Sequence, residues 1–236
     1  MTEAIPSQSS AERRARAEHR WPAAVAIAAA LLLYLLLPSS FTPVLRWVVA
    51  GVGVVLFVPL VFLNPHRFTR ETGWSRWVSF GIALLLLAAN QIALVQLISQ
   101  LVTSSSTDGP ALLLAALQVW VTNVIAFALV YWELDRGGPV RRRHARRVEL
   151  PPADFRFPQD EDHDAIDEVA TRSSRTSDWM PGFVDYLYFS ASNAMAFSPT
   201  DTMPLSHRAK LLMVSEAFTG FVILALVIAK SVSLLG

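Results

Sequence analysis

The stretch from Pro110 to Trp132, which reads PALLLAALQVWVTNVIAFALVYW, decides the fold because it contains no charged residue. A helix of about 20 apolar residues crosses a hydrocarbon core that is roughly 30 Å thick. Lipid offers no water to the backbone, so a single spanning segment satisfies its own N–H and C=O groups only as a helix. Further apolar runs cover 21–37, 44–63, 77–102 and 211–235. The sequence therefore predicts an all-α integral membrane bundle.

The composition agrees with this class of protein. Of the 236 residues, 53% are hydrophobic and 17% are charged, whereas charged residues make up about a quarter of a typical soluble domain. The chain has no cysteine, which excludes disulfides, thiolate metal sites and cysteine nucleophiles. The net charge of +1 does not by itself imply a partner.

The arginines gather in alternate connections between the apolar runs. They lie at 13–20 before the first run, at 67–76 after the second and at 136–147 after the fourth. The connections over 39–43 and 104–109 carry none. Because arginine and lysine near span ends are retained in the cytoplasm, this pattern predicts a multi-pass protein with a cytoplasmic N-terminus.

We expect four parts along the chain. Residues 1–20 form a basic cytoplasmic tail, 21–135 a four-helix transmembrane region, 136–180 a cytoplasmic linker and 181–236 a C-terminal helical hairpin. The linker has few apolar residues and contains blocks of each charge sign. Such a composition indicates a mostly disordered segment.

The charged motifs of the linker favour ordinary roles. The basic run Arg141–Arg147 follows a membrane span, so we expect it to set topology and contact membrane lipid, and we expect no nucleic-acid partner. The acidic stretch 160–164 begins like a calcium loop, but Ala165 and Thr171 stand where such a loop needs glycine and glutamate. No histidine shares a helical face with a second metal ligand. We therefore expect no metal, no cofactor and no catalytic residue.

Polar side chains inside the apolar runs are the candidate site residues. Asn90 lies near the middle of its run, where an amide either hydrogen-bonds between helices or lines a polar path. Glu216 lies about 10 Å inside the last run by helical rise. An ionisable group in lipid is costly unless it faces a partner or water. We therefore expect Glu216 to have a functional or packing role.

The last third of the chain has a recognisable layout. It reads Phe183-Val184-Asp185-Tyr186-Leu187-Tyr188-Phe189-Ser190, then Asn193-Ala194-Met195-Ala196-Phe197-Ser198-Pro199-Thr200-Asp201-Thr202-Met203-Pro204, and then Glu216-Ala217-Phe218-Thr219-Gly220. This resembles the pore module of two-helix potassium channels, which has a short aromatic pore helix, a filter, D-x-x-P and an inner helix with E-x-x-x-G. The candidate residues for a polar path are then Glu216, Asn193, Ser198, Thr200, Asp201 and, from an earlier run, Asn90.

The filter position departs from that family. Aligning Asp201 and Pro204 with D-x-x-P places 196–200 at the filter, where the family uses backbone carbonyls to replace the hydration shell of K⁺. The two filter glycines reach backbone angles that other residues adopt only with strain. Ser198 and Thr200 stand at those positions, and a proline, with φ fixed at about −65°, lies between them. We predict that no potassium-selective filter forms.

A second resemblance concerns the whole chain. With Trp132-Glu133-Leu134-Asp135-Arg136-Gly137-Gly138-Pro139 and the block quoted above, it resembles a group of uncharacterised bacterial membrane proteins. That resemblance implies a location in the bacterial plasma (inner) membrane and implies no reaction.

The stretch 183–197 leaves two topologies open. If it crosses the membrane, the bundle has six transmembrane helices, a turn over 199–204 lies outside, and both termini are cytoplasmic. If it dips in and returns, the bundle has five helices plus a re-entrant segment, and the last helix ends outside. We prefer six helices, because the prolines of 199–204 suit an external turn.

Two functions fit these observations. The first is a transport or ion-channel-like protein. The second is a non-catalytic membrane protein that acts through helix packing or through its cytoplasmic linker. An enzyme is not expected, because no nucleophile–base pair or metal set is visible. A homo-oligomer is compatible with either function.

Overall fold

The computed structural model describes residues 21–38, 46–55, 73–103, 109–161, 179–195 and 201–235. Its helices are α2 (Trp21–Leu35), α4 (Gly73–Thr103), α5 (Gly109–Leu134), α6 (Pro139–His144), α9 (Phe183–Met195) and α10 (His207–Leu235). A short apolar helix also covers Arg46–Val55. Three 3₁₀ turns (Asp135–Gly137, Arg147–Glu149 and Pro158–Asp160) and two strands, β1 (Phe155–Arg156) and β2 (Met203–Pro204), complete the described elements. The all-α prediction is confirmed.

Three helices in the described ranges are long and apolar enough to cross a membrane. They are Trp77–Thr103 within α4, Gly109–Gly137, which contains α5, and His207–Val232 within α10. The helices Trp21–Leu35 and Arg46–Val55 are apolar but shorter. These helices support the predicted membrane bundle, since apolar segments of this length are stable in lipid.

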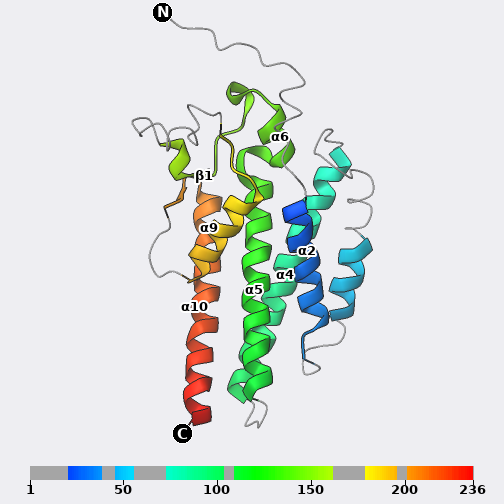
Figure 1. Ribbon diagram of the computed structural model, residues 1–236, viewed down its shortest axis with the longest axis vertical. Coiled ribbons are helices and arrows are strands. Elements are labelled where there is room, and N and C mark those ends of the chain that lie inside the picture. The colour runs from blue at the N-terminus through cyan, green and yellow to red at the C-terminus, as the bar shows by residue number, and fades with distance from the viewer. Residues whose placement is uncertain are drawn as a thin grey trace, which may run out of the picture.

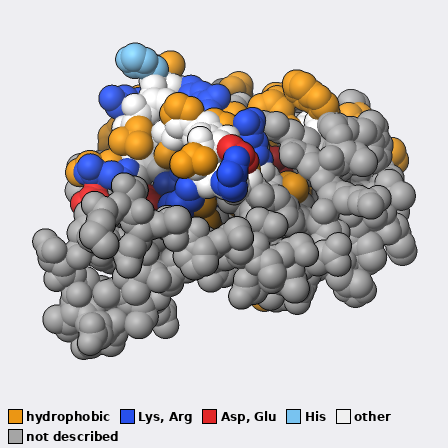
Figure 2. Space-filling model, turned by 90° about the horizontal axis from the view of Figure 1, so that it is seen from above, with side chains coloured by type: hydrophobic (Ala, Val, Ile, Leu, Met, Phe, Trp, Pro, Cys, Tyr) orange, Lys and Arg blue, Asp and Glu red, His pale blue; other side chains and the backbone are white. Residues whose placement is uncertain are grey.

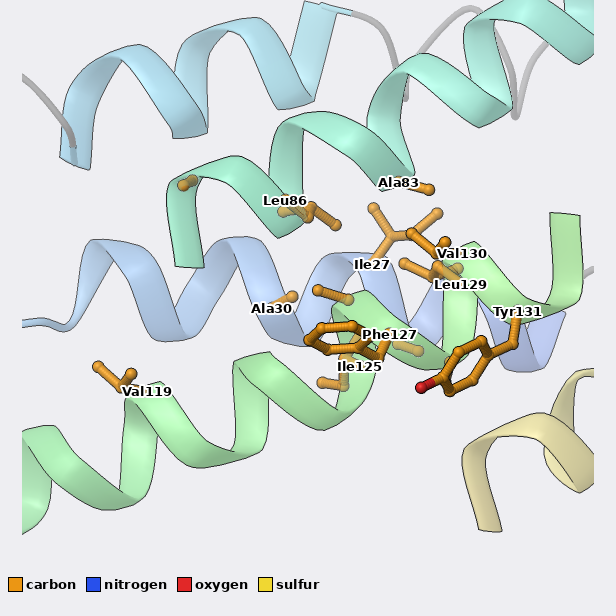
Figure 3. Packing of buried hydrophobic residues seen from close by; sticks show 14 of the residues in the cluster. Ile27, Ala30, Ala83, Leu86, Val119, Ile125, Phe127, Leu129, Val130 and Tyr131 are labelled. Carbon is orange, nitrogen blue, oxygen red and sulfur yellow. The ribbon is translucent and has the colours of Figure 1, made fainter. Parts of the chain in front are cut away.

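Helix α5 is the centre of the bundle and packs against α2, α4, α9 and α10 (Figure 1). Small side chains allow these close approaches, as Ala30 of α2 and Ala83 of α4 lie against α5 (Figure 3). Helices in lipid associate through such packing rather than through the hydrophobic effect. The central position of α5 means that one helix holds both the N-terminal helices and the C-terminal hairpin.

Helix α9 is short and lies between α5 and α10 near the end of the bundle that carries α6 and β1 (Figure 1). Its 13 residues extend about 20 Å, which is short of a hydrocarbon core of roughly 30 Å. It begins close to α6, since Arg143 Nη2 donates a hydrogen bond to the Met180 carbonyl at 2.9 Å.

The chain after α9 comes back to the same end. Strand β2 pairs antiparallel with β1, with Phe155 opposite Pro204 and Arg156 opposite Met203. Residues 203–204 therefore lie beside the segment that follows α5, whereas the six-helix reading puts a turn over 199–204 at the opposite end. The arrangement differs from our preferred topology because backbone pairing, and not the prolines, fixes where this connection lies.

Residues 136–161 also differ from the expected disordered linker. Phe155 and Phe157 are buried and contact the rings of Tyr131, Tyr186 and Phe189. Aromatic rings in such edge-on contacts stabilise packing beyond the area that they bury. The alternation Phe-x-Phe inside a charged stretch supplies the apolar surface that lets this segment fold onto the bundle.

A left-handed turn connects α5 to this segment. Arg136, Gly137 and Gly138 have φ angles of 52°, 80° and 94°, a region that glycine adopts without steric cost. The turn reverses the chain so that Arg136 lies within 2.7 Å of Asp160 as an ion pair. The backbone geometry at the end of α5 therefore explains the two glycines, while Arg136 adopts the same left-handed region beside its ion pair with Asp160.

Candidate functional site

Glu216 is the centre of the candidate site and is fully buried in α10. It lies about 14 Å along the helix axis from His207, where α10 begins. Its Oε2 accepts hydrogen bonds from the Tyr131 hydroxyl at 2.7 Å and from Asn193 Nδ2 at 2.7 Å. Its Oε1 contacts the Ser190 hydroxyl. One carboxyl group therefore joins α5, α9 and α10.

The spacing of residues on α9 explains how this helix supplies two of the partners. Ser190 and Asn193 are three residues apart, so they lie on the same face of the helix. Asn193 Nδ2 also donates to the Met213 carbonyl at 3.0 Å, and the Ser190 hydroxyl lies 2.8 Å from the Val124 carbonyl. Helix α9 is thus bonded to the backbone of both neighbouring helices.

A close helix contact completes the site one turn beyond Glu216. A Cβ atom built on Gly220 would overlap the carbonyl oxygen of Ala194. Glycine lets the backbones of α9 and α10 approach where any side chain would separate them. The E-x-x-x-G spacing therefore has a packing function in this chain, because it places a carboxyl and a gap on one face of α10.

The structure brings together only part of the predicted site. Asn193 contacts Glu216, as described above. Asp201 is exposed in the connection before β2. Ser198 and Thr200 lie outside the described residues. Asn90 belongs to a different cluster.

That cluster joins α4 to α5. Asn90 is fully buried, donates from Nδ2 to Asn123 Oδ1 at 2.8 Å and accepts from the Thr122 hydroxyl at 2.8 Å. Buried amides in membrane bundles commonly make such bonds between helices. The contacts of Asn90 therefore agree with the interhelical reading that its sequence position left open.

Two partners of Glu216 were not among the predicted site residues. Tyr131 lies at the polar end of an apolar run, and nothing in its local sequence distinguishes it from a lipid-facing aromatic residue. Ser190 interrupts the aromatic stretch of α9 and forms an i, i+3 pair with Asn193, which is a signal that sequence reasoning could have used. Only tertiary packing shows that both face Glu216.

A second polar cluster fastens the hairpin to the end of α5. Buried Asp135 accepts hydrogen bonds from the Tyr186 hydroxyl at 2.5 Å and from the Asp154 backbone N–H at 2.7 Å. Asp154 in turn accepts from Arg208 Nε at 2.7 Å and from the Ser206 hydroxyl at 2.5 Å. We call Asp135, Asp154, Tyr186, Ser206 and Arg208 the latch. It connects the first turn of α10 to the end of α5 through the segment that contains β1.

The basic run that we expected to contact lipid has mainly structural contacts. Arg142 is buried, donates from Nη1 to the Trp132 and Asp135 carbonyls at 3.0 and 2.7 Å, and lies 5.0 Å above the Tyr186 ring. Arg147 donates to the Trp179 carbonyl at 2.7 Å. Figure 2 shows Lys and Arg side chains among hydrophobic ones at this end of the molecule.

The exposed part of the same run is held by an acidic neighbour. Arg146 donates to Glu149 over three residues, with 2.8 Å between Nε and Oε1. These hydrogen bonds hold the pKa of the Glu149 carboxyl below its usual range. The side chains of both residues remain largely in solvent, so this pair contributes little to stability.

The chemistry available at the Glu216 site is that of a carboxyl, a phenol, a hydroxyl and an amide. Within the described ranges no group of three or more His, Cys, Asp or Glu side chains could hold a metal ion. The side chains of Glu216, Tyr131, Ser190 and Asn193 can together hold a proton or line a polar path. Comparisons with protein-family models, curated proteins and solved structures found no match to this chain.

Proposed function

We propose that this chain is a transport or ion-channel-like protein of the bacterial plasma (inner) membrane, in which hairpin α9–α10 forms the moving or conducting element. The observation that carries this proposal is the fully buried carboxyl of Glu216 at the junction of α5, α9 and α10. An ionisable residue in the middle of a membrane helix is costly, and such residues commonly mark ion or proton pathways.

The proposed topology is five membrane-spanning helices plus a re-entrant α9. Two observations support it: α9 has only 13 residues, and β2, which follows it in the chain, pairs with β1 near the end of the bundle at which α9 begins. In this topology that end lies in the cytoplasm, together with the N-terminus, because arginines near span ends are retained there and 136–147 contains six of them. The hairpin then resembles the potassium-channel pore module in layout but enters from the opposite side of the membrane.

Conduction through this hairpin is not expected to be potassium-selective. The sequence over 196–200 has no glycine, and a carbonyl-lined filter needs backbone angles that glycine provides. The proposed polar path instead depends on the side chains of Glu216 and Asn193.

The surroundings of α10 support membrane lipid as its main partner. The exposed residues of this helix include a row of large apolar side chains: Leu211, Val214, Phe218, Phe221, Leu224, Ile228 and Val232. A face of this kind is covered by lipid chains in a single copy, and a homo-oligomer would cover part of it with a second copy.

One observation favours the alternative function, a non-catalytic membrane protein that acts through helix packing or its cytoplasmic segment. The latch bonds the segment after α5 directly to the start of α10. A partner that bound this segment would act on the hairpin mechanically and would need no path for ions.

Ion flux into liposomes separates the two functions. We expect purified wild-type protein to carry a cation or proton flux and Glu216→Gln to lose most of it. The matched control is Ser215→Ala, because Ser215 is the adjacent residue of α10 and is exposed on its surface; its flux should equal that of wild type. Absence of flux in all three proteins would leave the alternative function.

A reporter fused after the last residue tests the topology independently. Five spans with a cytoplasmic N-terminus put the C-terminus outside, so a reporter that is active only in the periplasm should be active. Activity of a cytoplasm-specific reporter at the same position would restore the six-span topology.

A further inference from the structure

We propose that Glu216 is a proton-binding site. In the folded protein it is a neutral carboxylic acid, and its O–H group donates a hydrogen bond to the Ser190 hydroxyl. The proposal follows from counting the hydrogens available to the contacts around this residue. It does not depend on whether the hairpin conducts ions.

The contacts of Glu216 Oε2 are already supplied with hydrogens. Asn193 has two N–H groups on Nδ2, and its two acceptors are the Met213 carbonyl at 3.0 Å and Oε2 at 2.7 Å. The Tyr131 hydroxyl has one hydrogen, which points to Oε2 at 2.7 Å. Oε2 therefore accepts two hydrogen bonds and needs no proton of its own.

The contact of Oε1 is short of one hydrogen. The Ser190 hydroxyl has a single hydrogen but lies within bonding distance of both the Val124 carbonyl, at 2.8 Å, and Glu216 Oε1. If both contacts are hydrogen bonds at the same time, the hydroxyl donates to the Val124 carbonyl, which can only accept. The remaining contact between Ser190 and Oε1 then requires a hydrogen on Glu216. An ionised carboxylate would have to take the Ser190 hydrogen, and the contact with the Val124 carbonyl would then have none.

The charge around the site leads to the same conclusion. Across the described parts of the chain, no Lys, Arg or His nitrogen forms an ion pair with Glu216. The titratable group that faces it is the Tyr131 hydroxyl of α5, while α9 contributes only Ser190 and Asn193. The charged residues Asp185 and Lys210 lie in the first turns of α9 and α10. A buried carboxylate without a counter-ion is costly in lipid, and protonation removes that cost.

The bound proton has a structural consequence. It completes a chain of hydrogen bonds from Glu216 through Ser190 to the backbone of α5, so it attaches α9 to both neighbouring helices. After removal of the proton, the single hydrogen of Ser190 would serve either Glu216 or the Val124 carbonyl, so one of the two bonds would be lost. The position of α9 is therefore linked to occupancy of this site.

Infrared spectroscopy of the purified protein in lipid tests the proposal directly. We expect the C=O stretching band of a protonated carboxyl in wild type at neutral pH, and its loss in Glu216→Gln. Ser190→Ala should keep the band and shift it to higher frequency, because the proton loses its acceptor. Asp185→Asn is the matched control and should leave the Glu216 band in place.

The results that would overturn the proposal are equally clear. If wild type and Glu216→Gln have the same spectrum in the region of the protonated-carboxyl C=O stretch, Glu216 is ionised and the proposal is wrong. If Glu216→Gln does not fold, the Ser190→Ala spectrum decides, and a band identical to that of wild type would also overturn it.

Thermal unfolding provides a second readout. Glutamine is neutral, and its amide can donate to Ser190 while its oxygen accepts from Tyr131 and Asn193. We therefore expect Glu216→Gln to keep wild-type Tm at mildly acidic pH. Wild-type Tm should fall by several degrees as the buffer becomes alkaline, because the folded state holds a proton that the unfolded state releases, and the variant should not show this fall. Equal pH dependence in both proteins would contradict the proposal.

Discussion

Replacing Gly220 with alanine should separate α9 from α10, although alanine is the better helix former. A Cβ atom at this position would overlap the Ala194 carbonyl oxygen and lie only 3.2 and 3.3 Å from the Ala194 C and Cα atoms. These are backbone atoms, which cannot rotate away as a flexible side chain can. The two helices must therefore move apart.

The magnitude follows from two opposing terms. Alanine is favoured over glycine inside a helix by about 1 kcal/mol. Overpacking a tight contact costs about 1–3 kcal/mol, and a clash with backbone belongs at the upper end of that range. The net destabilisation should therefore be about 2 kcal/mol. For a chain of this size, it corresponds to a fall in Tm of about 4–8 °C.

The matched control is Gly81→Ala in α4. A Cβ atom at Gly81 meets nothing within 4 Å, so only the helix propensity term applies and Tm should rise by about 2–4 °C. Both variants are measured in the same detergent by circular dichroism. Opposite signs of the two shifts are the expected result. A Gly220→Ala protein that is as stable as Gly81→Ala would refute the packing of α9 against α10.

Further changes test the latch, the turn after α5 and the α4–α5 contact. In a double-mutant cycle, Asp154→Asn and Arg208→Gln should show a coupling energy of about 1 kcal/mol, because the hydrogen bonds are charge-assisted but the Arg208 side chain is largely in solvent; additive effects would mean that this pair contributes nothing to the latch. Gly138→Ala should destabilise the protein by about 1–3 kcal/mol because φ is 94° there, and unchanged Tm would contradict this backbone geometry. Asn90→Leu should cost about 1 kcal/mol through loss of two interhelical bonds, measured by unfolding in detergent, and an increase in Tm would show that the polar contact is unfavourable.

The helices of the bundle are predictable because hydropathy is a local property. Residues 77–102 and 110–132 are apolar over a length that suits lipid, and α4 and α5 extend over these runs. Glu216 and Asn193 are likewise visible in the sequence, because polar residues in apolar runs require an explanation. The resemblance of 183–220 to a pore hairpin was enough to identify both residues as candidates for the same polar path.

The contacts of the segment after α5 could not be predicted from hydropathy or composition. Composition indicated a disordered segment over 136–180, yet Phe155 and Phe157 are buried among aromatic rings. The mean hydropathy of this segment is low because its charged residues outnumber its apolar ones. Two buried phenylalanines are nevertheless sufficient to attach the segment to the bundle. The burial of Arg142 was hidden for a related reason, since its partners are carbonyl groups that any sequence possesses.

The sequence by itself predicted helices that are long and apolar enough for a membrane, and it showed that arginines occur in alternate connections between the apolar runs. Each of these features depends on how favourable it is to transfer each residue from water to lipid. That free energy follows from the residue type, so it can be taken from the sequence directly. Tertiary structure alone decided that the chain after α9 returns to the end of the bundle at which α9 begins, and that Glu216 contacts Tyr131 and Ser190. Those facts depend on contacts between residues that are far apart in the chain, such as Arg156 with Met203, and no local pattern specifies which distant groups will meet.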